Sequence, residues 1–341
     1  MINVNQTAAG SFDPGIYRII NYTGAFTNNT LDLGSIPPAS VEYIQTSVAN
    51  QVNLVDSTGL SLNIWDGEAT ANKNNGEING GDGLWHRSPT GNDNWTSLDG
   101  DINTNWLDGA FAIFQTNPGT VTVDNSLGQV TASGMQFATN GYVLTGDPLT
   151  LEETTTGSGQ STIRVGNGAS TGAGYIATID AVLQGDAQLV KADLGILVLN
   201  GANTYTGGTA FNGGTVRITS DSNLGQADGT LSFDGGTLAT GTSTDIAAAD
   251  MFAIAAIITS SRNTTLNALG GTFDVALDYP LTMSGVIDGE GTLTKIGAGT
   301  LTFTGENTYT GNTLLTEGIV QIGDGGTTCL LYTSDAADDL T

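Results

Sequence analysis

Cysteine, histidine and basic residues are scarce in this chain of 341 residues. It has one Cys, one His and eight Lys plus Arg against 34 Asp plus Glu, so its formal net charge is −26. One thiol cannot form an internal disulfide, and one imidazole cannot supply a metal site that needs several histidines. Nucleic acid is a poor partner for such a chain, because neutralising phosphates requires clustered Lys and Arg. We interpret the acidity as a source of solubility, with calcium as the alternative explanation.

Long apolar stretches and export signals are also absent. Residues 1–30 contain no basic segment followed by the apolar run that a signal peptide requires. The longest apolar-rich window, residues 246–258, contains Asp250 and is too short to cross a bilayer. No C-terminal series of alternating ten-residue segments predicts a membrane β-barrel. We therefore expect an internal piece of a longer protein, truncated at both ends.

The chain does contain an internal repeat. Residues 189–218 and 293–322 align without gaps at an offset of 104 positions and share fourteen identical residues. Such a repeat sets the architecture of a chain. The shared positions that we expect to be structural are Lys191, Gly195, Leu197, Gly201, Asn203, Tyr205 and Gly207 in the first copy, and Lys295, Gly299, Leu301, Gly305, Asn307, Tyr309 and Gly311 in the second.

Each copy has the pattern of short strands joined by tight corners. Leu197 and Leu199 alternate with a β-branched neighbour, and Val216 and Ile218 repeat the same period of two, which is typical of strands with one buried face. The Asn-Thr-Tyr-Thr-Gly segment between them is turn chemistry, because Asn and Gly tolerate positive φ. No stretch has a sustained helical period. The pattern predicts a β-solenoid, with a stacked β-sandwich array as the alternative.

The repeat closely resembles the autotransporter-associated β-strand repeat, of the form LTKxGxGTLTLSGxNTYTGGTTVxxGTL. The segments LGQADGTLSFDGG and MSGVIDGEG near the two copies resemble the spacers of that family. The resemblance extends over roughly residues 109–322. It implies a passenger region of an autotransporter from the Gram-negative cell surface, folded as an all-β, right-handed parallel β-helix.

The function implied by this resemblance is structural. Such a segment supports passenger folding and secretion across the outer membrane, and acts as a stalk or adhesin surface outside the cell. We expect a monomer without a cofactor, whose host or surface ligand is unknown. The resemblance implies secretion with the help of a signal peptide and a C-terminal barrel that lie outside this sequence. The alternative is a polysaccharide-degrading or polysaccharide-binding β-helix, which needs a groove that brings carboxylates together with Arg or Lys.

Composition divides the chain into four segments. Residues 1–64 contain strand-like pieces separated by Pro and Gly turns, and we expect β-helix-like rungs of a preceding passenger module. Residues 65–108 hold all four tryptophans amid Asn, Asp and Gly, which predicts a loop-rich excursion. Alternation resumes over residues 109–328, the predicted main β-helix. Residues 329–341 resemble the translation of a sequencing adapter, and we interpret them as foreign to the protein.

Three ligand hypotheses arise in residues 65–108. Asp82, Asp93, Asp99 and Asp101 could hold calcium, although no EF-hand or nonapeptide spacing is present. The tryptophans could stack on sugar rings, although anchoring a polar loop on the solenoid is their commoner role. His86 is the sole candidate for imidazole chemistry, and we expect it to be exposed and structural.

Catalysis is not expected. Glycoside hydrolysis needs two carboxylates across a cleft, and pairs such as Asp180 with Asp186, or Asp274 with Asp278, have no basic clamp beside them in the sequence. Catalytic sites also do not usually occur in two copies 104 residues apart.

The duplicated residues therefore suggest structural roles. We expect Lys191 and Lys295 to block sideways association of sheets, the paired Asn to satisfy backbone groups at corners, and the paired Tyr to keep their hydroxyls in water. If both copies have the same phase, 104 residues equal four or five rungs of about 26 or about 21 residues. Asn203 and Asn307 would then lie on one face, Leu197 and Leu301 would point inward, and the two tyrosines would share an edge.

Overall fold

The structure is a computed structural model, and it describes residues 1–4, 13–27, 31–87, 93–242, 256–323 and 329–332. Within these ranges the chain is all-β, and its helical segments are three short 3₁₀ turns: η1 (Thr70–Asn72), η2 (Ser170–Gly174) and η3 (Asp221–Leu224). No helix in the described part is long and apolar enough to span a membrane. The chain separates into two compact units, Met1–Ala177 with Asp193–Gly195, and Thr178–Ala192 with Ile196–Thr341.

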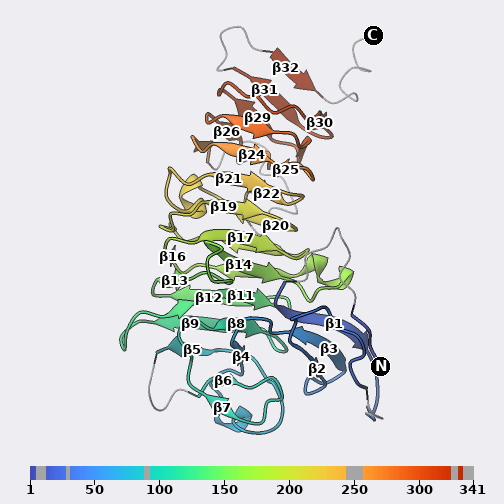
Figure 1. The fold of residues 1–341 in the computed structure, drawn as a ribbon. Coiled ribbons are helices and arrows are strands. Elements are labelled where there is room, and N and C mark those ends of the chain that lie inside the picture. The colour runs from blue at the N-terminus through green and yellow to red at the C-terminus, as the bar shows by residue number, and fades with distance from the viewer. Residues whose placement is uncertain (5–12, 28–30, 88–92, 243–255, 324–328, 333–341) are drawn as a thin grey trace. The chain divides into compact units, whose positions relative to one another are not determined.

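Unit 1 is built on parallel ladders in which each strand pairs with a strand one turn later in the chain (Figure 1). Phe111 pairs with Gly134, and Gly134 pairs with Thr162, at separations of 23 and 28 residues. Parallel neighbours need a connection of a dozen residues or more, and here a further strand of another ladder occupies that connection. The chain therefore coils as a β-solenoid. The first ladder runs β14 (Gln160–Val165), β11 (Gly134–Phe137), β8 (Phe111–Phe114), β4 (Leu62–Trp65), β6 (Trp95–Thr96) and β7 (Asn103–Thr104); the second runs β15 (Ile176–Ile179), β12 (Val143–Gly146), β9 (Thr120–Asp124) and β5 (Gly83–His86); the third contains β10 (Thr131–Ala132) and β13 (Leu149–Leu151).

The prediction of solenoid rungs over residues 1–64 is wrong except at β4. Strands β1 (Gly15–Asn21), β3 (Gln51–Asp56) and β2 (Glu42–Gln45) form an antiparallel sheet in that order. The five residues between β2 and β3 end at Asn50, whose φ is 64°. A connection of that length fits a hairpin and is too short for a parallel crossover.

The N-terminal sheet covers the outer side of the first ladder of unit 1. All four residues of β8, with the sequence FAIF, are buried. Phe114 faces the solenoid interior, where it contacts Phe137. Phe111 and Ile113 instead join a cluster with Ile16 of β1 and Val55 of β3. A strand without alternation is therefore buried on both faces.

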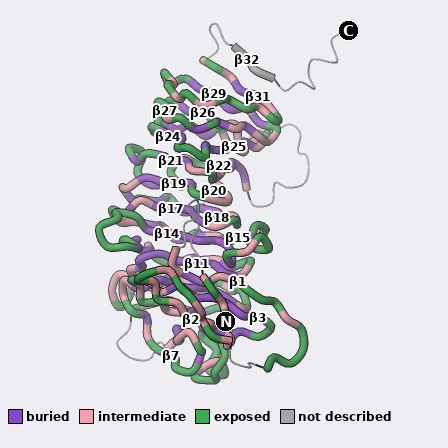
Figure 2. Tube along the Cα trace, turned by 45° about the vertical axis from the view of Figure 1, so that its right-hand side comes forward, coloured by how far each residue is buried: buried purple, intermediate pink, exposed green. Residues whose placement is uncertain are grey.

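Unit 2 contains three parallel ladders of the same kind (Figure 1). Several of their strands, Leu281–Met283 and Thr300–Phe303 among them, alternate between buried apolar residues and more exposed Thr residues, and the buried residues form the core of the coil (Figure 2). The right-handedness of the coil stays a prediction. The first ladder runs β17 (Gln188–Ala192), β19 (Thr209–Phe211), β21 (Leu231–Phe233), β24 (Thr264–Leu266) and β27 (Ile287–Gly289); the second runs β18 (Ile196–Leu199), β20 (Thr215–Ile218), β22 (Thr237–Thr240), β25 (Gly271–Asp274), β28 (Leu293–Ile296) and β30 (Thr313–Leu315); the third runs β23 (Ile258–Ser260), β26 (Leu281–Met283), β29 (Thr300–Phe303), β31 (Ile319–Ile322) and β32 (Cys329–Tyr332); the short β16 (Leu183–Gln184) precedes β17.

The two copies of the repeat lie on different ladders of unit 2. The first copy contributes β17 to the first ladder and β18 to the second, whereas the second copy contributes β28 to the second and β29 to the third. The offset of 104 residues is therefore four rungs plus one side of the coil. The prediction that both copies share a phase is wrong, and so is the shared face of Asn203 and Asn307. Leu197 and Leu301 do both point inward, as expected.

Unequal rung lengths explain the change of phase. Within each copy, paired residues of successive rungs are separated by the same short distance in sequence: Leu189 pairs with Thr209, and Leu293 pairs with Thr313, both 20 residues apart. Between the copies, Thr237 pairs with Thr272 at a separation of 35 residues. The rungs of this chain therefore differ in length, and no single period describes them.

The suspected foreign tail lies mostly outside the described residues. Residues Cys329–Tyr332 form β32, which pairs antiparallel with β31. The other pairs of that ladder, β23 with β26, β26 with β29 and β29 with β31, are parallel. Residues 333–341 are not among those described, so the interpretation of the tail stays a prediction.

Candidate functional site

The two repeat lysines are buried inside unit 2, where their ammonium groups hold backbone carbonyls. Lys295 Nζ donates to the carbonyls of Ile296 and Gly297, both at 2.6 Å, and of Glu317 at 3.2 Å. Lys191 Nζ donates to the equivalent carbonyls of Ala192 at 2.7 Å and Gly213 at 3.1 Å.

The expectation that these lysines block sheet association is wrong, because both side chains are 0% exposed. The sequence contained a signal for this. Lys295 follows Leu293 by two residues in a strand, so both side chains point to the same interior face.

The two repeat asparagines connect successive rungs. Asn203 Oδ1 accepts from the amide of Leu183 at 2.7 Å, and Asn307 Oδ1 accepts from the amide of Ile287 at 2.9 Å. Both partners lie 20 residues earlier, one rung back. Asn203 also donates through Nδ2 to the carbonyl of Asn223 at 2.6 Å. The expectation that these side chains satisfy backbone groups at a corner is confirmed.

The two repeat tyrosines differ in burial. The hydroxyl of Tyr205 lies 2.8 Å from Thr209 Oγ1, and that of Tyr309 lies 2.6 Å from Thr313 Oγ1, in the same relation. Tyr205 is fully buried, however, and burial raises its pKa. The expectation that its hydroxyl is in water is wrong, because the turn after η3 covers its ring at Gly225. Tyr309 is half-buried.

The repeat glycines mark positions where two rungs touch through their backbones. A Cβ on Gly201 would lie 2.6 Å from the carbonyl oxygen of Ala181, and one on Gly305 would meet the carbonyl of Gly285. Gly207, Gly311, Gly195 and Gly299 are likewise placed against neighbouring backbone. No side chain fits there without displacing a rung.

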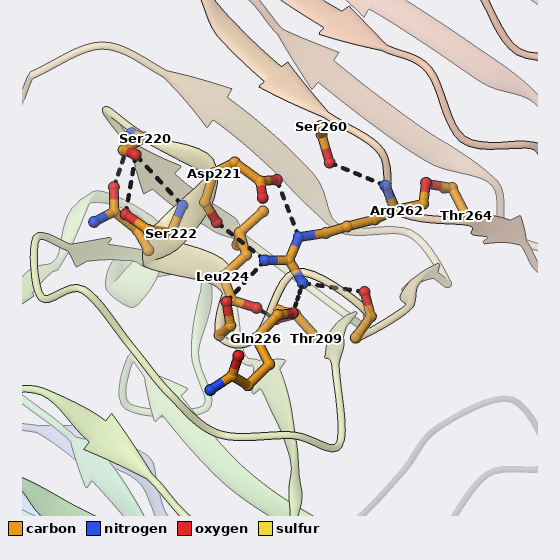
Figure 3. Close-up of polar contacts among 12 residues, drawn as sticks. Thr209, Ser220, Asp221, Ser222, Leu224, Gln226, Ser260, Arg262 and Thr264 are labelled. Carbon is orange, nitrogen blue, oxygen red and sulfur yellow. Dashed lines mark hydrogen bonds and ion pairs between the residues drawn. The ribbon is translucent and has the colours of Figure 1, made fainter.

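Arg262 is a structural residue that the sequence analysis missed. Its side chain is 0% exposed and pairs with Asp221 of η3 at 3.0 Å. Its guanidinium also donates to the carbonyls of Asp221, Gly225, Gln226 and Gly229, so all five N–H groups are used (Figure 3).

The Arg262 side chain thereby connects η3, which covers the corner of the first repeat, to the segment between β23 and β24. Arg262 belongs to the long rung, the one in which Thr237 and Thr272 are register partners 35 residues apart. Carbonyl groups of η3 accept hydrogen bonds from Asn203. Arg262 belongs to no repeat period, so no sequence signal pointed to its burial.

The four tryptophans of residues 65–108 do not form a sugar-binding surface. Trp65, Trp85 and Trp95 are 0% exposed and Trp106 is 5% exposed. Their rings pack against one another and against Phe114. Sugar stacking needs an exposed ring face, so this hypothesis is wrong for the structure.

The four acidic residues of the calcium hypothesis are engaged separately. Asp82 Oδ1 accepts from the amide of Thr120 at 2.7 Å, and Asp93 lies 3.7 Å from Lys73 Nζ. Asp99 Oδ1 accepts from the amide of Asp101 at 3.1 Å. Over the described ranges, no three His, Cys, Asp or Glu side chains are grouped as a metal site.

His86 lies at the end of β5 and is half-buried rather than exposed. Its strand partner is Asp124, and its Nδ1 has no hydrogen-bond partner among the described residues. Nothing in this arrangement resembles a nucleophile with its base.

Half of the basic residues that a polysaccharide-cleaving groove would draw on are inside the protein. Four of the eight cations are buried: Arg164, Lys191, Arg262 and Lys295. Of the carboxylates considered for catalysis, Asp180 accepts from Asn200 at 2.7 Å. Within unit 1, two polar grooves share Asn79 and Asn117, and no Lys, Arg or His lines either of them.

The parallel β-solenoid, with the side chains of its sequence repeat mostly buried, defines this chain as a repeat protein of the solenoid class. The passenger-associated-transport-repeat family matches residues 189–218 and 293–322, the same bounds as the two copies. The chain is 52% identical over 326 residues to the adhesin BmaC autotransporter of Brucella suis biovar 1 (strain 1330), which covers 94% of this chain and 9% of that protein. No solved structure matches. The chain therefore carries two passenger-associated-transport repeats, and both comparisons support an autotransporter passenger region with these repeats.

Proposed function

We propose that this chain is a structural segment of a surface-displayed autotransporter adhesin, and that it serves as a stalk between other parts of the passenger. The observation that carries the proposal is the direction of the repeat side chains. The Lys, Asn and buried Tyr groups of the repeats contact protein backbone or a neighbouring Thr. These duplicated side chains stabilise the rungs from inside the protein. Their polar groups are used in those contacts and do not serve to bind a ligand.

Surface display follows from the kinship with the BmaC adhesin, since autotransporter passengers cross the Gram-negative outer membrane to the cell surface. The chain spans 9% of that protein, so adhesion belongs to the proposal for the whole passenger. An adhesive contribution from this segment would come from unit 1, where polar grooves are lined by amides, hydroxyls and carboxylates. The missing cations make an anionic ligand unfavourable there.

We further propose that the segment has no enzymatic activity. The burial of half of its basic residues supports this view, because a polysaccharide lyase or hydrolase needs cations or a proton donor beside its carboxylates. Incubation with acidic and neutral polysaccharides should release no reducing ends and no unsaturated product. Turnover that a single carboxylate substitution abolishes would contradict the proposal.

The stalk role is testable by display. The chain can be inserted into a reporter passenger that has its own signal and membrane anchor, and surface exposure can be measured by protease and antibody access. We expect Asn203→Ala combined with Lys295→Met to reduce display, because both changes remove contacts between rungs. Tyr309→Phe, a change at a half-buried corner, is the matched control. Full display of the unstable variant would contradict a role in passenger folding.

A further inference from the structure

The parallel strands of unit 1 stop at β4 and β5. Beyond β4, the first ladder continues with β6 and β7, which are two residues long and antiparallel to their neighbours. β5 is the last strand of the second ladder, and the described residues supply no strand at its far edge. Before Leu62, the described residues add only the antiparallel sheet and one isolated bridge, between Ile2 and Leu33. The coil of unit 1 therefore has an end here (Figure 1).

Four indole rings close the core at this end. Trp95 lies centrally, with its ring centroid 5.0 Å from that of Trp65, 5.1 Å from Trp85 and 4.5 Å from Trp106. Phe114, in the next rung, lies 5.7 Å from Trp95. Aromatic rings bury about 150–250 Å² each, so four of them cover the apolar cross-section of a thin solenoid.

A polar layer next to the indoles is held together by the buried Asp66 and the half-buried Lys73. Lys73 Nζ donates to the carbonyls of Gly67 at 2.7 Å and Asp93 at 2.9 Å, and to Asn94 Oδ1 at 2.8 Å. Burial raises the pKa of the Asp66 carboxyl. Its two oxygens accept from the amide of Asn79 at 2.7 Å and from Asn103 Nδ2 at 2.8 Å. Segments far apart in the loop are thereby held together.

We propose that residues 66–87 and 93–107 form a terminal cap, which ends one solenoid block and prevents a second copy of the chain from stacking on its first rung. An open solenoid end exposes unpaired strand edges and apolar core, and both promote association. The antiparallel β6 and β7 occupy the edge of β4, and the indoles occupy the core. The described residues before Leu62 accordingly lie beside the coil and do not extend it.

The test compares Trp95→Ala with Phe233→Ala in the full chain, because both remove a fully buried ring, one in the cap and one in unit 2. If the cap closes the end, Trp95→Ala makes amide exchange in β4, β5 and β8 at least about tenfold faster. It also gives concentration-dependent association in light scattering, while exchange in β19–β22 is unchanged. Phe233→Ala should accelerate exchange in unit 2 without association.

A second variant covers the case in which Trp95→Ala fails to fold. Lys73→Met leaves the indoles intact and removes the group that ties the polar layer. We expect faster exchange in β4 and β6, together with weaker association of the same kind. Unchanged exchange in β4 and an unchanged monomer in Lys73→Met would overturn the proposal. Equal acceleration of all unit 1 rungs in Trp95→Ala would overturn it too.

Discussion

Replacing Lys295 by Met tests the role of the buried ammonium in unit 2. Met keeps most of the length and apolar volume of the side chain but donates no hydrogen bond. Three carbonyls lose their donor, those of Ile296, Gly297 and Glu317. The Ile296 carbonyl keeps one partner, the amide of Val275 at 3.1 Å.

The expected loss follows from the two remaining carbonyls. A buried acceptor left unpaired costs about 1–3 kcal/mol. Glu317 is exposed, so water can replace the ammonium at its carbonyl. Loss of the buried charge also removes a desolvation cost. We therefore expect unfolding of the second repeat to become easier by about 1–2 kcal/mol, mainly through the Gly297 carbonyl.

Native-state hydrogen exchange is the appropriate assay, because a solenoid can open locally without unfolding throughout. Amides of β28, β29 and β31 should exchange faster in Lys295→Met. The control is Arg87→Met, which removes the same charge from a partly exposed ion pair with Asp108 and should cost at most about 1 kcal/mol. If Lys295→Met exchanges like the parent chain, the carbonyls do not depend on the ammonium and the reasoning fails.

Two further predictions use the same repeat groups. Burial lowers the pKa of Lys295 to about 8 from its ordinary 10.5, so between these values the unfolded chain binds a proton that the folded chain does not. Stability relative to Lys295→Met should therefore rise with pH across that window; a difference independent of pH, measured by denaturant titration, would contradict the shifted pKa. Tyr205→Phe should cost about 1 kcal/mol, because the buried Thr209 hydroxyl loses one of two partners and keeps only the Leu224 carbonyl at 3.4 Å, whereas Tyr309→Phe should cost less. Equal losses in thermal unfolding would show that the two corners are equally buried.

The solenoid class was predictable because it depends on local periods. Strands such as β26 and β29 alternate with a period of two, and the paired Asn residues occupy corners of identical internal register. Their contacts reach one rung back, 20 residues, to Leu183 and Ile287, which precede the two copies. The corner and its spacing to the preceding rung therefore recur with the repeat wherever it occurs on the coil.

The phase of the second copy was not predictable, because it depends on residues outside the repeat. The pairing of Thr237 with Thr272 is set by everything between them, including residues 243–255, which are not described. Arg262 was also missed, because an isolated Arg has no period. The burial of Lys295, by contrast, was available from its alternation with Leu293 and was overlooked because Lys is seldom fully buried.

Burial of the tryptophans was obscured by composition. An Asn-, Asp- and Gly-rich segment is typical of exposed loops, and that description fits much of residues 65–108. Trp65 and Trp85 nevertheless lie on β4 and β5, which belong to the solenoid. Contacts between segments far apart in sequence, such as Asp66 with Asn103, decide the burial of these rings.

The central claim is that unit 2 is a parallel coil whose rungs differ in length, so that the two repeats lie one side apart. The most direct measurement is thiol cross-linking by a short bifunctional reagent in a Cys329→Ser background. Thr237→Cys with Thr272→Cys should cross-link rapidly, since these residues are register partners. Thr237→Cys with Asn263→Cys, the pairing expected from a uniform rung of about 26 residues, should not. Cross-linking of the second pair without the first would contradict the account.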